Sequence, residues 1–425
     1  MRPRASGSSP AGGAVTATTG SSGRPMTVLD RRRFLQLGIA ATFAARAGAA
    51  ARLRVVVAGA GIIGASAAWH LAQAGADVTV IDRAGPATRA SRGSFAWINA
   101  TWSKQPRAYH ALNQAGLARW RSLQPELKLP VRWGGSLEGI ADATLEVALA
   151  GRVAEQAAWG EATRIVAGAE LAALEPNVDF TGLNKVVFSG HDGATDPVAA
   201  TWAFLDAATA RGARVTYPCE LTGVAIAGGR LRAVQTDRGD IAADRLVLAT
   251  GAAADASLRF ADWEVPQRDS PGVTVITGPM PRLVQRVLWM PGVHLHQRDD
   301  GRIVLGEEAG PPATEAHALR LQEQPSEFPA QEIALQHAER MRLAALRFVP
   351  GLTAARFEDA RICWRPMPLD GYPVLGASPA RPDVYLAVMH SGVTLAPIVG
   401  QCIAQEIVAG APVESLDAFR PHRAS

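Results

Sequence analysis

A chain of 425 residues, 48% hydrophobic and 19% charged, excludes a disordered protein, a collagen-like fibre and a polytopic membrane protein. The net charge is +4, but the first 54 residues hold nine arginines and one aspartate; the rest is net acidic, with 34 basic and 38 acidic residues, so we expect no nucleic-acid partner. Three cysteines are too few for a disulfide framework or a cysteine-rich zinc site, and we expect no metal.

The first fifty residues have the character of a targeting segment. Residues 1–25 are rich in Gly, Ser, Ala and Thr without an apolar period, which predicts disorder. Residues 31–35, Arg-Arg-Arg-Phe-Leu, resemble a twin-arginine export signal. The apolar stretch at 34–45 is shorter than the roughly 20 residues that span a bilayer. Alternate alanines at 45–51 offer a cleavage site of the A-x-A type.

We therefore expect residues 1–50 to be a disordered leader with a twin-arginine signal peptide. The twin-arginine machinery would then export the protein to the periplasm or the extracellular space. An amphipathic N-terminal helix or an uncleaved anchor is the alternative for this segment, and the cytoplasm is the alternative location. Met26 stands just before the arginines, which makes translation from Met26 instead of Met1 a further hypothesis.

The folded part opens with a pattern typical of a dinucleotide-binding unit. Residues 54–58 form a β-branched run that predicts a buried parallel strand, and residues 65–72 predict a helix. A second strand is predicted at residues 77–81 and ends in Asp82, 18 residues after the last glycine of the loop. The loop between the first strand and the helix has the G-x-G-x-x-G spacing and reads Gly59-Ala60-Gly61-Ile62-Ile63-Gly64.

Each residue type in this unit has a physical reason. Gly59 permits the tight turn, Gly61 lets a pyrophosphate approach the backbone, and Gly64 lets helix and strand pack closely. The helix N-terminus supplies amides and a partial positive charge to phosphates. Asp82 would accept hydrogen bonds from the adenosine ribose, and its charge argues against NADP, although Arg83 beside it tempers that argument. A glycine-rich loop without a ligand is the alternative.

A helix start is predicted at residues 195–197, Thr-Asp-Pro. Asp196 would be the N-cap and Pro197 the first helical residue. The following residues place Trp202, Leu205 and Ala208 on one stripe at helical spacing. We expect this stripe to face the core.

Later segments bear on which dinucleotide is bound. Residues 246–251 predict a strand that ends in Ala249-Thr250-Gly251, after a β-meander with glycine turns. No second G-x-G-x-x-G is present, so no separate NAD domain is expected. Residues 364–376 contain Arg-Pro and Asp-Gly-Tyr-Pro, and a strand at 384–388 precedes His-Ser-Gly-Val-Thr-Leu-Ala-Pro at 390–397.

These motifs, in this order over residues 52–423, resemble the D-amino acid oxidase family in the broad sense that includes glycine oxidase and sarcosine oxidase. The resemblance implies FAD as cofactor. It implies an α/β fold, α+β overall, in which a Rossmann-like FAD-binding domain is interleaved with an antiparallel-sheet substrate domain. The FAD-binding domain would comprise residues 52–105, 190–265 and 350–425, and the substrate domain residues 106–189 and 266–349.

The activity implied is oxidation of the C–N bond of a small amino acid or N-alkyl amino acid. A hydride would pass to flavin N5 and the imine product would hydrolyse, with oxygen as electron acceptor and hydrogen peroxide as product. One alternative is an amino acid or amine dehydrogenase that passes electrons to a quinone or carrier. Another is a non-catalytic flavoprotein that serves as an electron-transfer subunit. A plain NAD dehydrogenase would leave the C-terminal segment unexplained.

Three residues are candidates for the chemistry. Arg365 lies where glycine oxidase-like members place the arginine that binds the substrate carboxylate, a task that suits a guanidinium fork. Its alternative role is a structural salt bridge. His294 and His296 alternate on a predicted strand and share one face, and related oxidases offer a tyrosine near the position of His294. For each histidine the alternative is a buried ring with its hydrogen bonds satisfied.

Cys363 aligns with the cysteine through which sarcosine oxidase-like members attach FAD covalently, and a small buried thiol is the alternative. Ser91 falls near the FAD phosphates by the same resemblance, or is an ordinary helix cap. The segment that starts at Gly392 matches a loop whose amides face the flavin pyrimidine oxygens. The candidate cofactor-binding residues are therefore Gly59, Gly61, Ile63, Gly64, Asp82, Arg83, Ser91, Ala249, Gly251, Cys363, Gly392, Val393, Thr394 and Leu395.

One departure from the family concerns oxygen. Sarcosine oxidase-like members carry a lysine near flavin N5 that activates oxygen. Here Val304 stands at about that position, and no lysine lies between residues 186 and 425. This favours the dehydrogenase alternative slightly, although D-amino acid oxidase functions without that lysine.

Overall fold

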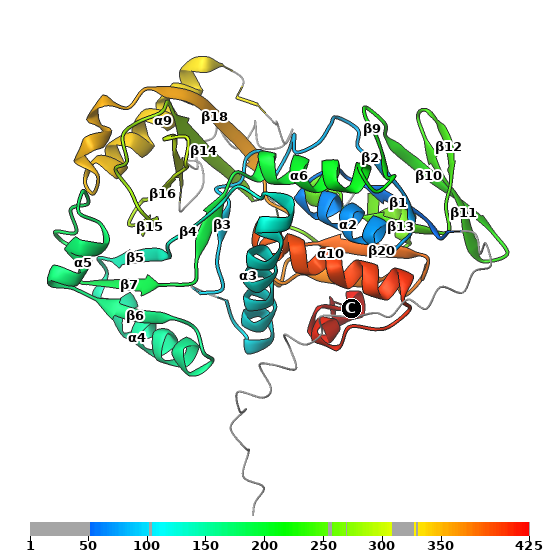
Figure 1. The fold of residues 1–425 in the computed structure, drawn as a ribbon, viewed down its shortest axis with the longest axis horizontal. Coiled ribbons are helices and arrows are strands. Elements are labelled where there is room, and N and C mark those ends of the chain that lie inside the picture. Colours follow the sequence, from blue (N-terminus) through cyan, green and yellow to red (C-terminus); the bar gives the residue numbers. More distant parts are fainter. Residues whose placement is uncertain are drawn as a thin grey trace, which may run out of the picture. The chain divides into compact units, whose positions relative to one another are not determined.

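The computed structural model describes residues 52–101, 104–253, 257–268, 270–307, 327–328 and 330–424. The expected leader and twin-arginine signal lie outside these residues. The chain from residue 52 onward forms one compact unit built on two large sheets (Figure 1). Among the described helices, none has the length and apolar character needed to cross a membrane.

The first sheet carries the predicted dinucleotide-binding unit. Its central strands are parallel and β19 at one edge is antiparallel, so the β1–α2–β2 crossover has the form that the sequence predicts. In spatial order its strands are β19 (Val374–Ala377), β20 (Val384–Val388), β13 (Arg245–Leu248), β1 (Arg54–Ala58), β2 (Asp77–Ile81) and β9 (Arg214–Thr216).

Strand β1 is buried on both faces, which explains its unbroken β-branched run. Val55 and Val57 face a core shared with helices α2 (Ile62–Gln73), α3 (Arg107–Leu127), α6 (Pro197–Thr209) and α10 (Gly392–Val408). Val56 and Ala58 face a second core under a three-stranded meander. In Figure 1 the helices and the meander lie on opposite sides of β1 and β13. The meander consists of β10 (Leu221–Ala227), β11 (Arg230–Thr236) and β12 (Gly239–Ala242).

The second sheet is antiparallel except where β15 pairs with β5. Its core includes residues of helix α9 (Gln331–Leu346), which packs on β14, β16 and β18. The expected ranges placed residues 350–425 in the FAD-binding part, yet β18 belongs to this sheet. The strands, in order, are β18 (Phe357–Trp364), β14 (Pro271–Thr277), β17 (Ile303–Gly306), β16 (Val293–Gln297), β15 (Val287–Met290), β5 (Ser136–Ile140), β7 (Lys185–Ser189) and β6 (Thr163–Val166).

Smaller elements join the two sheets. A three-stranded sheet contains β3 (Trp97–Ile98), β8 (Gly193–Thr195) and β4 (Val131–Trp133). Two further α-helices in the described residues are α4 (Ala143–Ala158) and α5 (Gly168–Leu174). Short 3₁₀ helices occupy Gly251–Ala253, Arg259–Ala261, Pro350–Ala354, Glu414–Phe419 and Pro421–Ala424.

Helix α6 begins as predicted, but one residue of its stripe was assigned to the wrong face. The Asp196 carboxylate accepts hydrogen bonds from the amides of Val198 (2.9 Å) and Ala199 (3.1 Å). Leu205 is buried as expected, whereas Trp202 is 38% exposed and its ring lies 6.4 Å from that of Tyr217. The prediction for Trp202 was wrong because the three-residue spacing drifts around the helix, and Phe204 occupies the core position instead.

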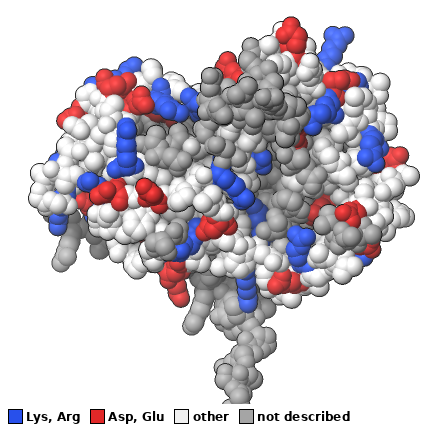
Figure 2. Space-filling view, turned by 180° about the vertical axis from the view of Figure 1, so that it is seen from behind, with Lys and Arg blue, Asp and Glu red and all other residues white. Residues whose placement is uncertain are grey.

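The structure confirms a mixed α/β fold with a Rossmann-like sheet. Lys and Arg side chains are interspersed with Asp and Glu on the face shown in Figure 2.

Candidate active site

A cavity of about 820 Å³ is lined by residues from both large sheets, which is within the range of small-molecule and cofactor sites. At one end are the loop after β1 and the residues that follow β2 and β13. At another are the ends of β14, β16 and β18 and the start of α10. The cavity therefore brings together segments that lie more than 300 residues apart.

Two glycines of the loop, Gly59 and Gly64, have no room for a side chain. A Cβ on Gly59 would lie 2.3 Å from the carbonyl oxygen of Ala249, and φ at Gly59 is +106°. A Cβ on Gly64 would lie 1.9 Å from the carbonyl oxygen of Gly59, which confirms the close approach of helix and strand. Gly59, Gly61, Ile63 and Ala249 all line the cavity.

Two polar side chains hold this loop in place. The Asp82 carboxylate accepts hydrogen bonds from the amides of Ala60 (2.8 Å), Ala84 (2.9 Å) and Gly85 (2.9 Å). The Ser91 hydroxyl accepts one from the Ile62 amide (3.0 Å). Asp82 and Ser91 also line the cavity, as do Arg83 and Gly251, so they can contact a ligand as well as shape the loop.

The first turn of α10 forms part of the cavity wall. Gly392, Val393 and Thr394 line it, whereas Leu395 is buried behind them. Pro397 has no N–H to give to the carbonyl of Val393 four residues earlier, and the Trp120 indole N–H donates to that oxygen instead, at 2.9 Å.

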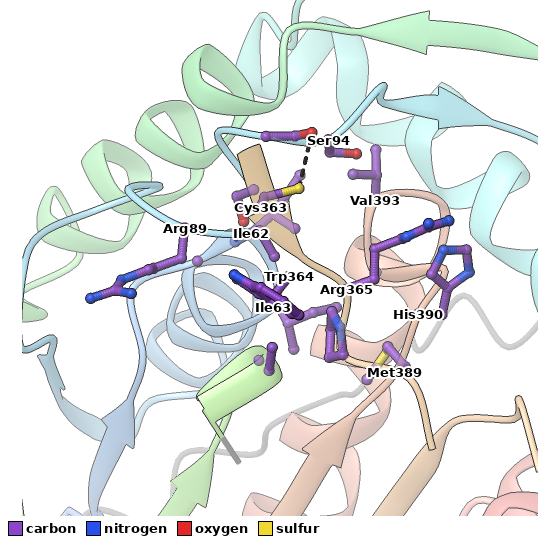
Figure 3. Close-up of a pocket in the computed structure, with 18 of the residues that line it drawn as sticks. Ile62, Ile63, Arg89, Ser94, Cys363, Trp364, Arg365, Met389, His390 and Val393 are labelled. Atoms are coloured by element: carbon purple, nitrogen blue, oxygen red, sulfur yellow. Dashed lines mark hydrogen bonds between the residues drawn. The ribbon is translucent and has the colours of Figure 1, made fainter. Parts of the chain in front are cut away.

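Arg365 and Cys363 lie on the cavity wall at the end of β18. The Arg365 guanidinium donates to the carbonyl oxygens of Ser270 (3.4 Å) and Pro271 (2.7 Å), and it forms no ion pair with any described acidic residue. Burial lowers the pKa of Arg365, but a guanidinium stays charged at neutral pH. The Cys363 thiol donates to the Gly93 carbonyl (3.2 Å; Figure 3), and burial raises its pKa to about 11.

The two candidate histidines have different positions. His294 lines the cavity, stacks on Trp289 with ring centroids 4.5 Å apart, and passes over Gly306, where a Cβ would lie 2.1 Å from its Nε2. His296 is not among the lining residues, and its Nε2 is 2.9 Å from the Phe95 carbonyl. Burial lowers the pKa of each to about 3, helped by Arg365 at His294 and by Arg298 at His296, so both are neutral at pH 7.

Sequence reasoning missed several cavity residues. Lys104 is buried, donates to the Ser391 hydroxyl at 2.6 Å, and lies over the Tyr109 ring. Arg268 and His390 complete this end of the cavity. The one sequence signal for Lys104 was its rarity, since lysine occurs only three times in this arginine-rich chain.

The residues present fit a dinucleotide. The bare glycine loop, its amides at the start of α2 and the Asp82 carboxylate suit a pyrophosphate and a ribose, as the sequence motif requires. The start of α10 offers amides to a ring system farther along the cavity. In the described part of the chain, no group of three or more His, Cys, Asp or Glu residues could hold a metal ion.

Comparison with known proteins agrees with this geometry. The family profile described as "FAD dependent oxidoreductase" matches residues 54–406. The uncharacterized oxidoreductase YurR of Bacillus subtilis (strain 168) is 28% identical over 383 residues, covering 83% of this chain and 94% of that protein. Glycine oxidase of Bacillus licheniformis is 25% identical over 387 residues, covering 88% and 98%. The crystal structure of L-proline dehydrogenase from P. horikoshii has the same fold, with a TM-score of 0.76 at 22% identity over 88% of this chain and 97% of that one.

Proposed function

This chain belongs to the FAD-dependent oxidoreductase family, and on that premise we propose that it oxidises the C–N bond of a small amino acid or N-alkyl amino acid. One observation carries the proposal: Arg365 presents to the cavity, which also holds the glycine loop, a guanidinium that pairs with none of the acidic residues described by the structure. A half-buried guanidinium of this kind is suited to a carboxylate ligand. The similarity to glycine oxidase supports the same substrate class.

Residues of this chain would bind and orient the substrate. Arg365 would hold the substrate carboxylate and thereby fix the carbon that is to be oxidised. His294 is neutral and faces the cavity, so it adds no charge that would repel an ammonium group as the substrate enters. The amine would lose one proton to solvent before the hydride leaves, because the nitrogen lone pair forms the new C=N bond. Bound FAD supplies the acceptor for the hydride that leaves this carbon. The substrate then has a C=N bond, and water converts the imine to a carbonyl compound and an amine.

We propose oxygen as the final acceptor, with hydrogen peroxide as product. Lys104 provides a buried cation in the cavity although Val304 replaces the lysine of sarcosine oxidase-like members. A dehydrogenase that reduces a quinone or carrier remains the alternative reaction.

The test is a visible spectrum of the purified protein without oxygen, before and after adding D-amino acids and N-methyl amino acids. Bleaching of the flavin band by at least one of them is expected. Admitting air should reoxidise the flavin at least as fast as the enzyme turns over, restore the band and form hydrogen peroxide. Slow reoxidation of the flavin in air, with fast reoxidation on adding a quinone, would indicate a dehydrogenase. A band that no amine bleaches would contradict the proposed reaction and favour an electron-transfer subunit.

We propose that FAD is held without a covalent bond to Cys363. A thiolate is the reactive form of cysteine, and a thiol with a pKa of about 11 that donates to the Gly93 carbonyl is far from that form. Precipitation of the holoenzyme with acid should leave all flavin in the supernatant. Yellow protein in the pellet that Cys363→Ser abolishes would show the covalent link instead.

We also propose export by the twin-arginine route, for which the sequence at residues 31–35 is the support. Fusion of residues 26–60 to a reporter should direct it out of the cytoplasm. Changing Arg31 and Arg32 to lysine should retain the reporter inside, and unchanged export would refute the proposal.

A further inference from the structure

The strand pair β14–β18 continues beyond its ends as a two-stranded ribbon along the cavity. Arg365 N donates to Ser270 O (2.9 Å), and Arg268 N donates to Met367 O (3.0 Å). An isolated bridge pairs Gln267 with Pro368 between the same segments, in the same register. Residue 268 is therefore two positions from Ser270, which lies opposite Arg365.

This register places two guanidinium groups on one face. In an antiparallel pair, residues opposite each other and residues two apart point to the same side, so Arg365 and Arg268 are diagonal neighbours, roughly 7–8 Å apart or somewhat less at their Cβ atoms. A Cβ on Gly272 would lie 3.5 Å from the Arg365 Nε and 3.7 Å from the Cys363 Sγ, which places these two side chains on one face. Arg268 and Met367 line the same cavity, as do the neighbouring Trp364 and Pro366. Arg365 is half-buried and Arg268 is exposed.

Both charges lack an acidic partner in the described residues. Within the described part of the chain, Arg365 donates to the carbonyl oxygens of Ser270 and Pro271, and Arg268 has no ion pair. Asp370 is next to Gly371, where a Cβ would lie 3.8 Å from the Arg268 guanidinium, but the Asp370 carboxylate pairs with Arg423 at 3.1 Å. Each arginine charge lowers the pKa of His390, after the larger effect of burial and with Lys104, so the positive charges converge on one region. In Figure 3 the Arg365 guanidinium extends toward the side where the His390 ring lies.

A substrate with one carboxylate would occupy one of these guanidinium groups and leave the other without a counter-ion among the residues that the structure describes. We propose that the substrate class of this enzyme is an amino acid with a second acid group, the first carboxylate bound by Arg365 and the second acid by Arg268. This rests on the proposed C–N oxidation. The apolar side chain of Met367, between the two on the same face, would contact the carbons that separate the acid groups. Arg268 is thus a specificity-determining residue.

Lys104 is not assigned to the diacid site that Arg365 and Arg268 form. It also lies near His390, but its ammonium donates to the Ser391 hydroxyl at the start of α10, and it does not belong to the paired segments that carry the two arginines.

The test compares inert ligands that cannot be oxidised because oxygen replaces the amine nitrogen. Methoxyacetate carries one carboxylate, and oxydiacetate has the same backbone with a second. Their dissociation constants for the holoenzyme are measured from the change in the flavin spectrum. The diacid should bind about tenfold more tightly than the monoacid, the size expected of one added charge-assisted hydrogen bond.

Three variants test which arginine causes the tighter binding of the diacid. Arg268→Met should bring the two dissociation constants together by weakening the diacid alone, and Arg365→Met should weaken both ligands. Arg230→Met, which removes an exposed arginine of β11 outside the cavity, should change neither. Equal binding of the two ligands to the unmodified enzyme, or a preference that survives Arg268→Met, would overturn the proposal.

Substrates then identify the source of the second acid. Anaerobic bleaching is compared for N-methylglycine against N-carboxymethylglycine, and for alanine against aspartate in both stereoisomers. A higher kcat/KM for the diacid in the first pair places the second acid on the nitrogen substituent, and in the second pair on the side chain. If only the monoacids bleach the flavin, C–N oxidation is supported and the requirement for a second acid group is refuted. If no substrate bleaches the flavin, C–N oxidation itself is refuted. The binding experiment then still tests whether Arg365 and Arg268 together bind a diacid.

Discussion

At the scale of single residues, close contacts decide which positions accept change. Gly64 and Gly151 are both glycines within helices, and both would gain helix propensity as alanine. Their surroundings are opposite. A Cβ on Gly64 would lie 1.9 Å from the Gly59 carbonyl oxygen, whereas nothing lies within 4 Å of a Cβ on Gly151.

We therefore expect Gly64→Ala to lower the melting temperature strongly and to abolish FAD retention, because the glycine loop must move away from the helix. Gly151→Ala should raise the free energy of unfolding by up to about 1 kcal/mol. Thermal unfolding and the flavin-to-protein absorbance ratio check both. Retention of FAD by Gly64→Ala would show that the loop tolerates displacement.

Residue positions also show how far sequence reasoning reached at the site. Asp82 and Ser91, which the sequence predicts as cofactor-binding residues, line the cavity, and each also accepts hydrogen bonds from backbone amides of the glycine-loop region. Alternation placed His294 and His296 on one face, but of the two His294 lines the cavity, whereas the His296 ring lies 2.9 Å from the Phe95 carbonyl oxygen. No local pattern reveals such a partner, since Phe95 belongs to a segment about 200 residues away.

At the scale of elements, helix α10 illustrates how a local defect is compensated at long range. Pro397 leaves the Val393 carbonyl without its intrahelical donor, in the turn that lines the cavity. Trp120 of α3 supplies the missing N–H and is fully buried. A buried carbonyl that loses its partner costs more free energy than the bond itself contributes.

We expect Trp120→Phe to lower the free energy of unfolding by about 1–3 kcal/mol, from the loss of the donor and of some packing. Trp202→Phe on α6 is the matched control, because that side chain is 38% exposed, and it should change the free energy of unfolding by less than about 0.5 kcal/mol. Urea unfolding of the two variants side by side makes the comparison. Equal effects would mean that the Val393 carbonyl finds another donor.

At the scale of the whole molecule, one buried carboxyl joins the parts of the fold. Asp192 accepts hydrogen bonds from the Trp97 indole (3.1 Å) of β3, the Thr101 hydroxyl (3.0 Å) and the Ser136 hydroxyl (2.7 Å) of β5. Burial raises the pKa of Asp192 to about 7 against the effect of these donors. Trp97 also lines the cavity, so this junction supports the site.

The raised pKa has a defined sign for stability. Between pH 4 and 7 the folded protein binds a proton at Asp192 that the unfolded chain has lost, so this group's contribution to the free energy of unfolding falls as the pH rises. Asp192→Asn removes the titration, and the loss of stability between pH 4.5 and 7 should be smaller in the variant by about 1 kcal/mol or more. Urea unfolding at several pH values measures this difference. Parallel pH profiles for the two proteins would contradict it.

The sequence alone determined the dinucleotide-binding unit and the class of the protein. Strand β1, the Gly59–Gly64 loop, helix α2 and Asp82 are contiguous, so their spacing encodes their geometry directly. The tertiary structure alone decided which distant side chains share the cavity, and it brought Lys104 to Ser391, Arg268 beside Arg365, and β18 into the second sheet. These contacts depend on strand pairing and helix packing between remote segments, where a one-residue change of register reverses the face on which a side chain lies.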